Sequence, residues 1–156
     1  MMLKDIKIEE IPWQNAPIEL LLLADPSRSM ITKYLGQSTI LTANLKKEVI
    51  GIIALYPIEE FMLEIKNLAV LPNYQNQGVG KFLIQHAENS ARSKGFFSLR
   101  ICTGNSSFSQ LALYQKLGFH IAGKVEKYFL KHYPEPIFEN GILCRDLIIL
   151  EKGITK

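Results

Sequence analysis

The chain has 156 residues, of which 47% are hydrophobic and 21% charged, and its formal net charge is +3. These values are typical of one globular domain and exclude a mostly disordered chain, because disorder requires low hydrophobicity and high net charge. The 18 Lys and Arg residues are scattered along the chain rather than gathered into a basic stripe, so we expect no nucleic-acid partner.

Two cysteines, Cys102 and Cys144, are too few for a secreted disulfide scaffold, and no Cys/His cluster has zinc-ligand spacing. We therefore expect free thiols, on neighbouring strands, and no metal. Residues 1–7 are mixed in charge and do not resemble a signal peptide, and no apolar run reaches the ~20 residues of a membrane helix. The sequence thus predicts a cytoplasmic protein without a membrane partner.

Hydrophobic periodicity divides the first half of the chain into short elements. Pro12 and Pro17 interrupt the backbone after the first of them, and Asp25-Pro26-Ser27 is a typical turn and helix start. Residues 49–55 are apolar on both faces, as expected for a central strand. The predicted elements are an edge strand at 2–9, helices at 17–24 and from 27 to 36, and strands at 38–44, 49–56 and 60–71.

A long amphipathic helix is predicted over residues 78–94, because its apolar residues repeat at helical spacing and Lys94-Gly95 is a typical helix end. A strand, a helix and two further strands follow, at 97–103, 107–117, 119–130 and 142–150. A strand, a helix and a strand in the centre form a βαβ unit, so the fold class is α/β with a mixed sheet. We expect one domain over residues 1–152 and a short C-terminal tail at 153–156.

The segment Gln75-Asn76-Gln77-Gly78-Val79-Gly80-Lys81 stands between a predicted strand and the long helix. Its glycines permit close approach of the backbone to a ligand, and N–H groups at a helix start bind phosphate. It is neither a P-loop nor a Rossmann fingerprint, because GxxxxGK[ST] and GxGxxG are both absent. The pattern [QR]xxGx[GA] alone is equally consistent with a glycine-rich turn that only starts a helix.

A second motif, LYxxxGF, ends the next predicted helix with Leu113-Tyr114 and Gly118-Phe119. With both motifs in this order, and with the strand at 64–70 ahead of them, the chain resembles the GNAT family, the GCN5-related N-acetyltransferases, over residues 38–130. The resemblance implies a single domain with a mostly antiparallel sheet of about seven strands, a central βαβ unit and about four helices. It also implies acetyl-CoA as the co-substrate, without a metal.

The resemblance further implies where acetyl-CoA would bind. The pantetheine arm would pair like an added strand with Leu68, Ala69 and Val70, and an N–H group there would polarise the thioester carbonyl. Backbone amides that would hold the pyrophosphate belong to Gln75, Gln77, Gly78, Val79, Gly80 and Lys81. Where family members often have an asparagine, this chain has Ser107. The nearest asparagine, Asn105, is the expected further cofactor contact, with a plain strand-to-helix turn as the alternative.

Tyr114 and Glu64 are the candidate catalytic side chains. The resemblance places Tyr114 beside the CoA sulfur as general acid for the leaving thiolate, and the alternative is a core aromatic on an amphipathic helix. Glu64 is the candidate general base for the acceptor ammonium. The alternative is a strand glutamate paired with Lys66, with a water chain acting as the base. By strand alternation Glu64, Lys66 and Leu68 share one face unless a bulge intervenes.

The acceptor is expected to be a primary amine, because the segments that would surround it contain acidic and aromatic side chains. These candidates are Asp25, Tyr34, Tyr128, Tyr133, Glu135 and Phe138. The sequence therefore predicts an acetyl-CoA-dependent N-acetyltransferase that acts on a small-molecule amine by direct attack in a ternary complex. A protein N-terminal or lysine acetyltransferase and a non-catalytic acyl-CoA-binding module are the alternatives, and the family resemblance is compatible with a homodimer.

Overall fold

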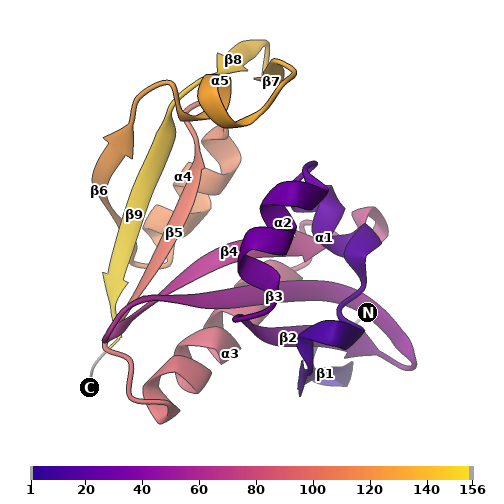
Figure 1. Ribbon diagram of the computed structural model, residues 1–156. Helices are drawn as coiled ribbons and strands as arrows, with labels where there is room; N and C mark the ends of the chain where they lie inside the picture. Colours follow the sequence, from indigo (N-terminus) through magenta and orange to yellow (C-terminus); the bar gives the residue numbers. More distant parts are fainter. Residues whose placement is uncertain (1, 155–156) are drawn as a thin grey trace.

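The computed structural model describes residues 2–154, which form one mixed sheet with helices on both faces (Figure 1). The sheet has the strand order β1-β2-β3-β4-β5-β9-β6, and a separate hairpin contains β7 and β8. The strands are β1 (Ile6–Ile11), β2 (Thr39–Leu45), β3 (Glu48–Glu59), β4 (Met62–Val70), β5 (Ser98–Gly104), β6 (His120–Val125), β7 (Ile137–Glu139), β8 (Ile142–Cys144) and β9 (Leu147–Gly153). The α-helices are α1 (Ile18–Ala24), α2 (Arg28–Leu35), α3 (Val79–Ser93), α4 (Phe108–Lys116) and α5 (Tyr128–His132).

Neighbouring strands of the seven-stranded sheet are antiparallel except β4 and β5, which are parallel and connected through α3. This confirms the predicted mixed, mostly antiparallel sheet with a central βαβ unit. Helix α3 begins after Gly78, whose φ is 89°, and ends just before Gly95, whose φ is 86°. Glycine adopts this left-handed conformation without the steric cost that a Cβ adds, so the two glycines set the limits of the helix.

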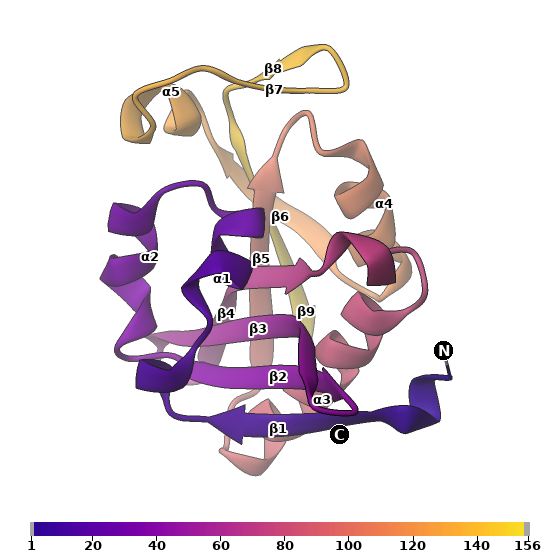
Figure 2. The same cartoon turned by 90° about the vertical axis from the view of Figure 1, so that its right-hand side faces the viewer.

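Two apolar clusters hold the sheet between its helical layers, and Figure 2 shows α1 and α2 on one side of it and α3 on the other. The central strand β3 contributes to both clusters. Ile53 and Leu55 are buried in the cluster that contains α3, whereas Ile52 and Ala54 are buried in the cluster that contains α1 and α2. This is the two-faced burial that the apolar run at 49–55 predicts.

The C-terminal part departs most from the predicted elements. Strand β6 ends at Val125, and residues 128–132 form α5 instead of the last part of a strand that reaches 130. The chain turns at Lys127, whose φ is 59° and whose backbone N–H donates to Asp146 Oδ1 at 2.9 Å. The strand predicted at 142–150 is likewise divided into β8 and β9.

The cysteines and the C-terminus complete the comparison. Cys102 lies on β5 and Cys144 on β8 of the separate hairpin, so the expectation of neighbouring strands is wrong; both are free thiols. Strand β9 runs to Gly153, and Ile154 is 2% exposed, so ordered structure continues past residue 152. Residues 155–156 of the expected tail lie outside the described residues. None of the helices in the described part of the chain has the length and apolar character needed to cross a membrane.

Candidate active site

A cavity opens where β4 and β5 separate. The two strands pair only over Met62–Ile65 and Ser98–Ile101, and beyond this point β5 pairs with β9 alone. Figure 1 shows β5 and β9 rising away from β4. The cavity between them has a volume of about 630 Å³ and is lined by residues of both strands and of the helices around them. The distal half of β4, residues 66–70, therefore has β3 on one side and a free edge on the other.

The free edge of β4 carries backbone groups that a ligand can bind. The N–H of Leu71 donates to Ile50 O on β3 at 2.8 Å. Because successive residues of a strand direct their N–H and C=O groups to opposite sides, those of Leu68 and Val70 point to the free edge. Gln75 Nε2 already donates to Val70 O at 2.9 Å. The N–H of Leu68 is thus a donor directed into the gap between the two strands.

A bulge in β4 decides which way Glu64 faces. Ala54 pairs with Asn67 and the next residue of β3, Leu55, pairs with Ile65, so Lys66 is the extra residue. Glu64 pairs with Tyr56, which packs against the α1–α2 cluster, whereas Leu68 pairs with a residue of the α3 cluster. Glu64 therefore does not share a face with Leu68, and the bulge is the exception that strand alternation allows for.

The environment of Glu64 is polar although the residue is only 8% exposed. Lys66 Nζ lies 3.0 Å from Glu64 Oε2 and 5.7 Å from the ring centroid of Tyr56. The sequence predicts this ion pair with Lys66 if Glu64 is a strand glutamate and not the general base. Because Glu64 also lines the cavity, the same carboxylate is accessible to a ligand.

The segment Gln75–Lys81 contains several backbone N–H groups without an acceptor among residues 2–154, next to the start of α3. Asn76 has a φ of 62° and Gly78 a φ of 89°, and alternation of left- and right-handed residues produces a concave nest of backbone N–H groups. The first backbone bond of the helix runs from Phe82 N–H to Gly78 O at 3.0 Å. The N–H groups of residues 79–81 precede it and have no backbone acceptor among residues 2–154, so they can bind an anion.

Tyr114 lies on α4 and lines the cavity, 6% exposed. Its ring packs edge-on against Phe119, with centroids 6.2 Å apart, and its hydroxyl forms no hydrogen bond with any residue in 2–154. Burial raises the pKa of Tyr114 to about 12. The hydroxyl therefore keeps its proton at neutral pH and can donate it in a hydrogen bond to a ligand.

Cys102 also lines the cavity, next to Glu64 and Arg100. Burial and, to a smaller extent, the negative charge of Glu64 raise the pKa of the Cys102 thiol to about 12. Since only the thiolate is strongly nucleophilic, Cys102 is unreactive at neutral pH. Arg100 lies with its guanidinium against Glu151, with Nε and Nη2 at 2.9 and 2.7 Å from Oε2.

Four of the six predicted acceptor-site residues line the same cavity: Asp25, Tyr34, Tyr128 and Tyr133. The other two, Glu135 and Phe138, do not. Tyr133 donates its hydroxyl proton to Asp25 Oδ1 at 3.0 Å and so connects two walls of the cavity that are far apart in sequence.

One residue that the sequence analysis does not single out, Asn67, stabilises this wall. Asn67 Nδ2 donates to Leu21 O at 2.9 Å and to the Tyr34 hydroxyl at 3.0 Å, while its Oδ1 is buried and unpartnered within residues 2–154. The signal in the sequence is slight, since Asn67 is the one amide side chain of an otherwise largely apolar strand.

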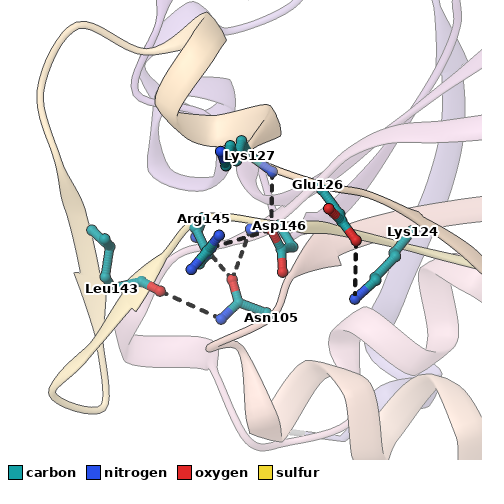
Figure 3. Close-up of polar contacts among 7 residues, drawn as sticks. All are labelled: Asn105, Lys124, Glu126, Lys127, Leu143, Arg145 and Asp146. Atoms are coloured by element: carbon teal, nitrogen blue, oxygen red, sulfur yellow. Dashed lines mark hydrogen bonds and ion pairs between the residues drawn. The ribbon is translucent and has the colours of Figure 1, made fainter.

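Asn105 is not among the residues that line the cavity. Its side chain instead bonds to the backbone of the segment that follows β8 and to Leu143 (Figure 3). Its Oδ1 accepts from the backbone N–H groups of Arg145 and Asp146, at 2.8 and 3.0 Å. Its Nδ2 donates to Leu143 O at 3.4 Å. These bonds tie the end of β5 to the segment between β8 and β9, which is where the predicted strand at 142–150 is interrupted.

The described residues therefore bring together Glu64, Leu68 and Tyr114 around one cavity, with the nest at residues 77–81 beside it. A free strand edge that leads to an anion-binding helix start fits an extended ligand with a phosphate group, as in acyl-CoA-dependent transferases. No group of three or more His, Cys, Asp or Glu side chains in the part of the chain covered by the structure is arranged to hold a metal ion.

Comparison with known proteins supports this class. The family model described as "Acetyltransferase (GNAT) family" matches residues 6–119. A Bacillus subtilis protein named "Uncharacterized N-acetyltransferase YvbK" is 44% identical over 132 residues, which are 85% of this chain and 85% of that protein. The chain belongs to the GNAT acetyltransferase family, and it is an acetyltransferase.

Solved structures agree with this assignment. An "IAA acetyltransferase from Bacillus cereus ATCC 14579" has a TM-score of 0.92 and 45% identity, covering 95% of this chain and 99% of that one. A GNAT family acetyltransferase from Elizabethkingia anophelis, solved with acetyl-CoA bound, has a TM-score of 0.91 and 43% identity, covering 96% and 98%. Acetyl-CoA is therefore the co-substrate of this fold, as the resemblance implies.

Proposed function

We propose that the protein transfers the acetyl group of acetyl-CoA to the primary amine of a small molecule, by direct attack within a ternary complex. The observation that carries the proposal is that the free N–H of Leu68 belongs to a residue that lines the same cavity as Glu64 and Tyr114. For a thioester bound beside Leu68, Glu64 would act as the base for the acceptor amine, and the Tyr114 hydroxyl would be the donor to the leaving sulfur.

Binding of acetyl-CoA uses the backbone more than the side chains. The N–H groups of Gln77, Gly78 and residues 79–81 hold the pyrophosphate. The backbone N–H of Gln75, expected to join them, instead donates to Pro72 O at 3.3 Å. The free groups of Leu68 and Val70, with Ala69 between them, pair with the pantetheine arm as an added strand would. Asn105 contributes indirectly, because its hydrogen bonds hold the end of β5.

The transfer forms a bond from the amine nitrogen to the acetyl carbonyl carbon and breaks the carbon–sulfur bond. Glu64, directly or through water, accepts the proton that the ammonium group loses before attack. The Leu68 N–H donates to the carbonyl oxygen as negative charge develops on it. Tyr114 gives its hydroxyl proton to the leaving sulfur as general acid, and the second proton lost by the attacking nitrogen, carried through water, restores the phenol, so the products are the acetamide and the CoA thiol. Direct attack is favoured over an acetyl-cysteine intermediate, because the thiol of Cys102 stays protonated.

A small acceptor fits better than an extended peptide. The hydrogen bond from Tyr133 to Asp25 joins the α5 segment to the end of α1 across the acceptor end of the cavity. We expect this bridge to hinder an extended peptide more than a small amine. The free thiols accord with the reducing cytoplasm that the sequence predicts.

The test is a thiol-release assay with acetyl-CoA against a panel of primary amines and short peptides, with thermal unfolding in the presence of CoA as the binding measurement. We expect stabilisation by CoA, because a ligand that binds only the native state raises its stability, and turnover with amines. Gly78→Ala and Gly95→Ala form a matched pair, since both glycines have left-handed φ values, of 89° and 86°.

Only Gly78→Ala is expected to weaken CoA binding, because Gly95 lies at the opposite end of α3. Turnover with peptides alone would replace the small-molecule proposal with a peptide acetyltransferase. CoA binding without turnover on any acceptor would favour the acyl-CoA-binding module.

A further inference from the structure

The acceptor end of the cavity contains a carboxylate that pairs with no cation of residues 2–154. Asp25 follows the last residue of α1 and lines the cavity. Its Oδ1 accepts hydrogen bonds from the Tyr133 hydroxyl at 3.0 Å and from the Ser27 backbone N–H at 3.1 Å. Among residues 2–154, no Lys, Arg or His forms an ion pair with it. Its negative charge is available to a ligand.

The cations of the cavity are already paired with carboxylates. Lys66 lies 3.0 Å from Glu64, and Arg100 lies 2.7 Å from Glu151. The remaining charged residue of the lining, Glu139, accepts a hydrogen bond from the Ser107 hydroxyl at 2.6 Å. The lining therefore offers no unpaired cation to a ligand carboxylate, whereas a ligand cation can bind the unpaired carboxylate of Asp25.

Three tyrosines, Tyr34, Tyr128 and Tyr133, line the cavity together with Asp25, and Tyr133 contacts it directly. Burial raises the pKa of all three tyrosines, and the negative charge of Asp25 adds to the rise in each. Tyr128 lines the cavity together with Asp25 and Glu64, and burial and then the charges of both carboxylates raise its pKa. Aromatic rings beside a carboxylate are a favourable environment for an ammonium group.

We propose that the acceptor is a diamine: one amine reacts beside Glu64, and the second, protonated amine binds Asp25 among the rings of Tyr34, Tyr128 and Tyr133. The first half of this statement rests on the proposed function, whereas the contact with Asp25 does not. The site selects against amino acids, because their carboxylate would meet Asp25 and Glu64 without a free cation to bind it.

The experiment compares three acceptors of equal chain length, with three to six carbons: an unbranched diamine, the monoamine, and the ω-amino acid. We expect kcat/KM to be about tenfold higher for the best diamine than for its monoamine, and lowest for the amino acid. Asp25→Asn keeps an acceptor oxygen for Ser27 and Tyr133 but removes the charge, and it is expected to bring the ratio of diamine to monoamine close to one.

Glu19→Gln is the matched control, because it makes the same change of charge on the exposed side of α1. This variant should keep the preference for the diamine. Tyr128→Leu is a second variant, which removes a ring without touching the hydrogen bonds of Asp25, and it should reduce the same ratio. Equal kcat/KM for diamine and monoamine in the unmodified protein, or an unchanged ratio in Asp25→Asn, would overturn the proposal.

Calorimetry of amine binding to the CoA-loaded protein separates this inference from the proposed function. If no amine is acetylated, the proposed function fails. The diamine site then stands only if the diamine binds at least about tenfold more tightly than the monoamine and Asp25→Asn abolishes the difference. If neither amine binds, the diamine site is also wrong.

Discussion

Glu64 and Leu68 face opposite sides of β4 although strict alternation would place them on the same side. The bulge at Lys66 causes the change, and it coincides with the point where β4 and β5 stop pairing. One irregularity thereby directs the Glu64 side chain toward the side of α1 and α2 and the Leu68 side chain toward α3. The backbone N–H of Leu68 stays at the free edge of β4, where the proposed thioester binds.

Leu68→Pro tests the role of the free N–H. Proline removes this donor, and the sheet tolerates it because the Leu68 N–H does not point toward β3. We expect turnover to fall about 100-fold while the protein remains folded, since removal of one donor to a developing oxyanion typically has this effect. Single-turnover kinetics and circular dichroism measure the two quantities.

Ala69→Pro is the matched control for this variant. The N–H of Ala69 points toward β3, so its loss breaks the sheet and should lower the melting temperature much more than Leu68→Pro does. If Leu68→Pro left turnover unchanged, the N–H of Leu68 would have no catalytic role.

Tyr114→Phe distinguishes a proton donor from a core aromatic. The phenyl ring keeps its edge-on packing against Phe119, and the hydroxyl has no hydrogen-bond partner within residues 2–154 to lose, so the melting temperature should be unchanged. Turnover should fall by about 100-fold, the lower end of the usual contribution of an acid–base group. CoA affinity, measured by calorimetry, should stay within about twofold. Unchanged turnover would assign Tyr114 to the core alone.

The sequence predicts those parts of the fold that depend on residues close together in the chain, and it misses those that depend on contacts between distant segments. The βαβ unit and the limits of α3 are predicted correctly, because apolar periodicity and the two glycines are local signals. Helix α5 is missed: its five residues are too few for a period to be visible, and its position depends on the bond from Phe129 N–H to Arg145 O. The side of β4 that Glu64 occupies depends on pairing with β3, which no local pattern encodes.

The predicted site follows the same division. The motifs at Gln75–Lys81 and around Tyr114 predict the proposed cofactor region, since both are contiguous in sequence. Asn105 is adjacent to the site but bonds to a segment about forty residues away, and the sequence offers no sign of those partners. The sequence does not predict the role of Asn67 either, because its hydrogen-bond partners lie on α1 and α2, far from it in the sequence.

Gly104→Ala tests how closely the β7–β8 hairpin packs on β5. A Cβ at Gly104 would overlap Cys144 Sγ, and Cys144 is 2% exposed and has little room to retreat. We expect the free energy of unfolding to fall by about 1–3 kcal/mol, as for other overpacked interiors. Denaturant titration measures this change.

Two companion variants make the Gly104→Ala result specific. Addition of Cys144→Ala removes the overlapping sulfur and should recover most of the lost stability. Gly123→Ala is the same substitution on β6, where the nearest atom, Ile149 Cδ1, is 4.0 Å from the added Cβ, and it should have little effect. Equal losses for the two single alanine variants would contradict the packing argument.

Cys102 should make the protein less stable as the pH rises above neutrality. Burial and Glu64 raise the pKa of its thiol to about 12 in the folded state, against about 8.5 in the unfolded chain. Between these values the unfolded chain releases a proton that the folded protein retains, so increasing pH favours unfolding. Tyr34 and Tyr114, whose pKa values are raised to about 12, add to the effect above about pH 10.

The contribution of Cys102 is therefore most separable between about pH 8.5 and 10. Urea titrations across this range should show a decline in the free energy of unfolding that Cys102→Ala reduces. Cys144→Ala should reduce it less, because the nearby Ser106 hydroxyl opposes the rise that burial causes in the pKa of Cys144. A Cys102→Ala protein with the same pH dependence as the unmodified one would mean that the thiol ionises freely in the native state. The argument for direct attack would then lose its support, since a thiolate beside the thioester could itself accept the acetyl group.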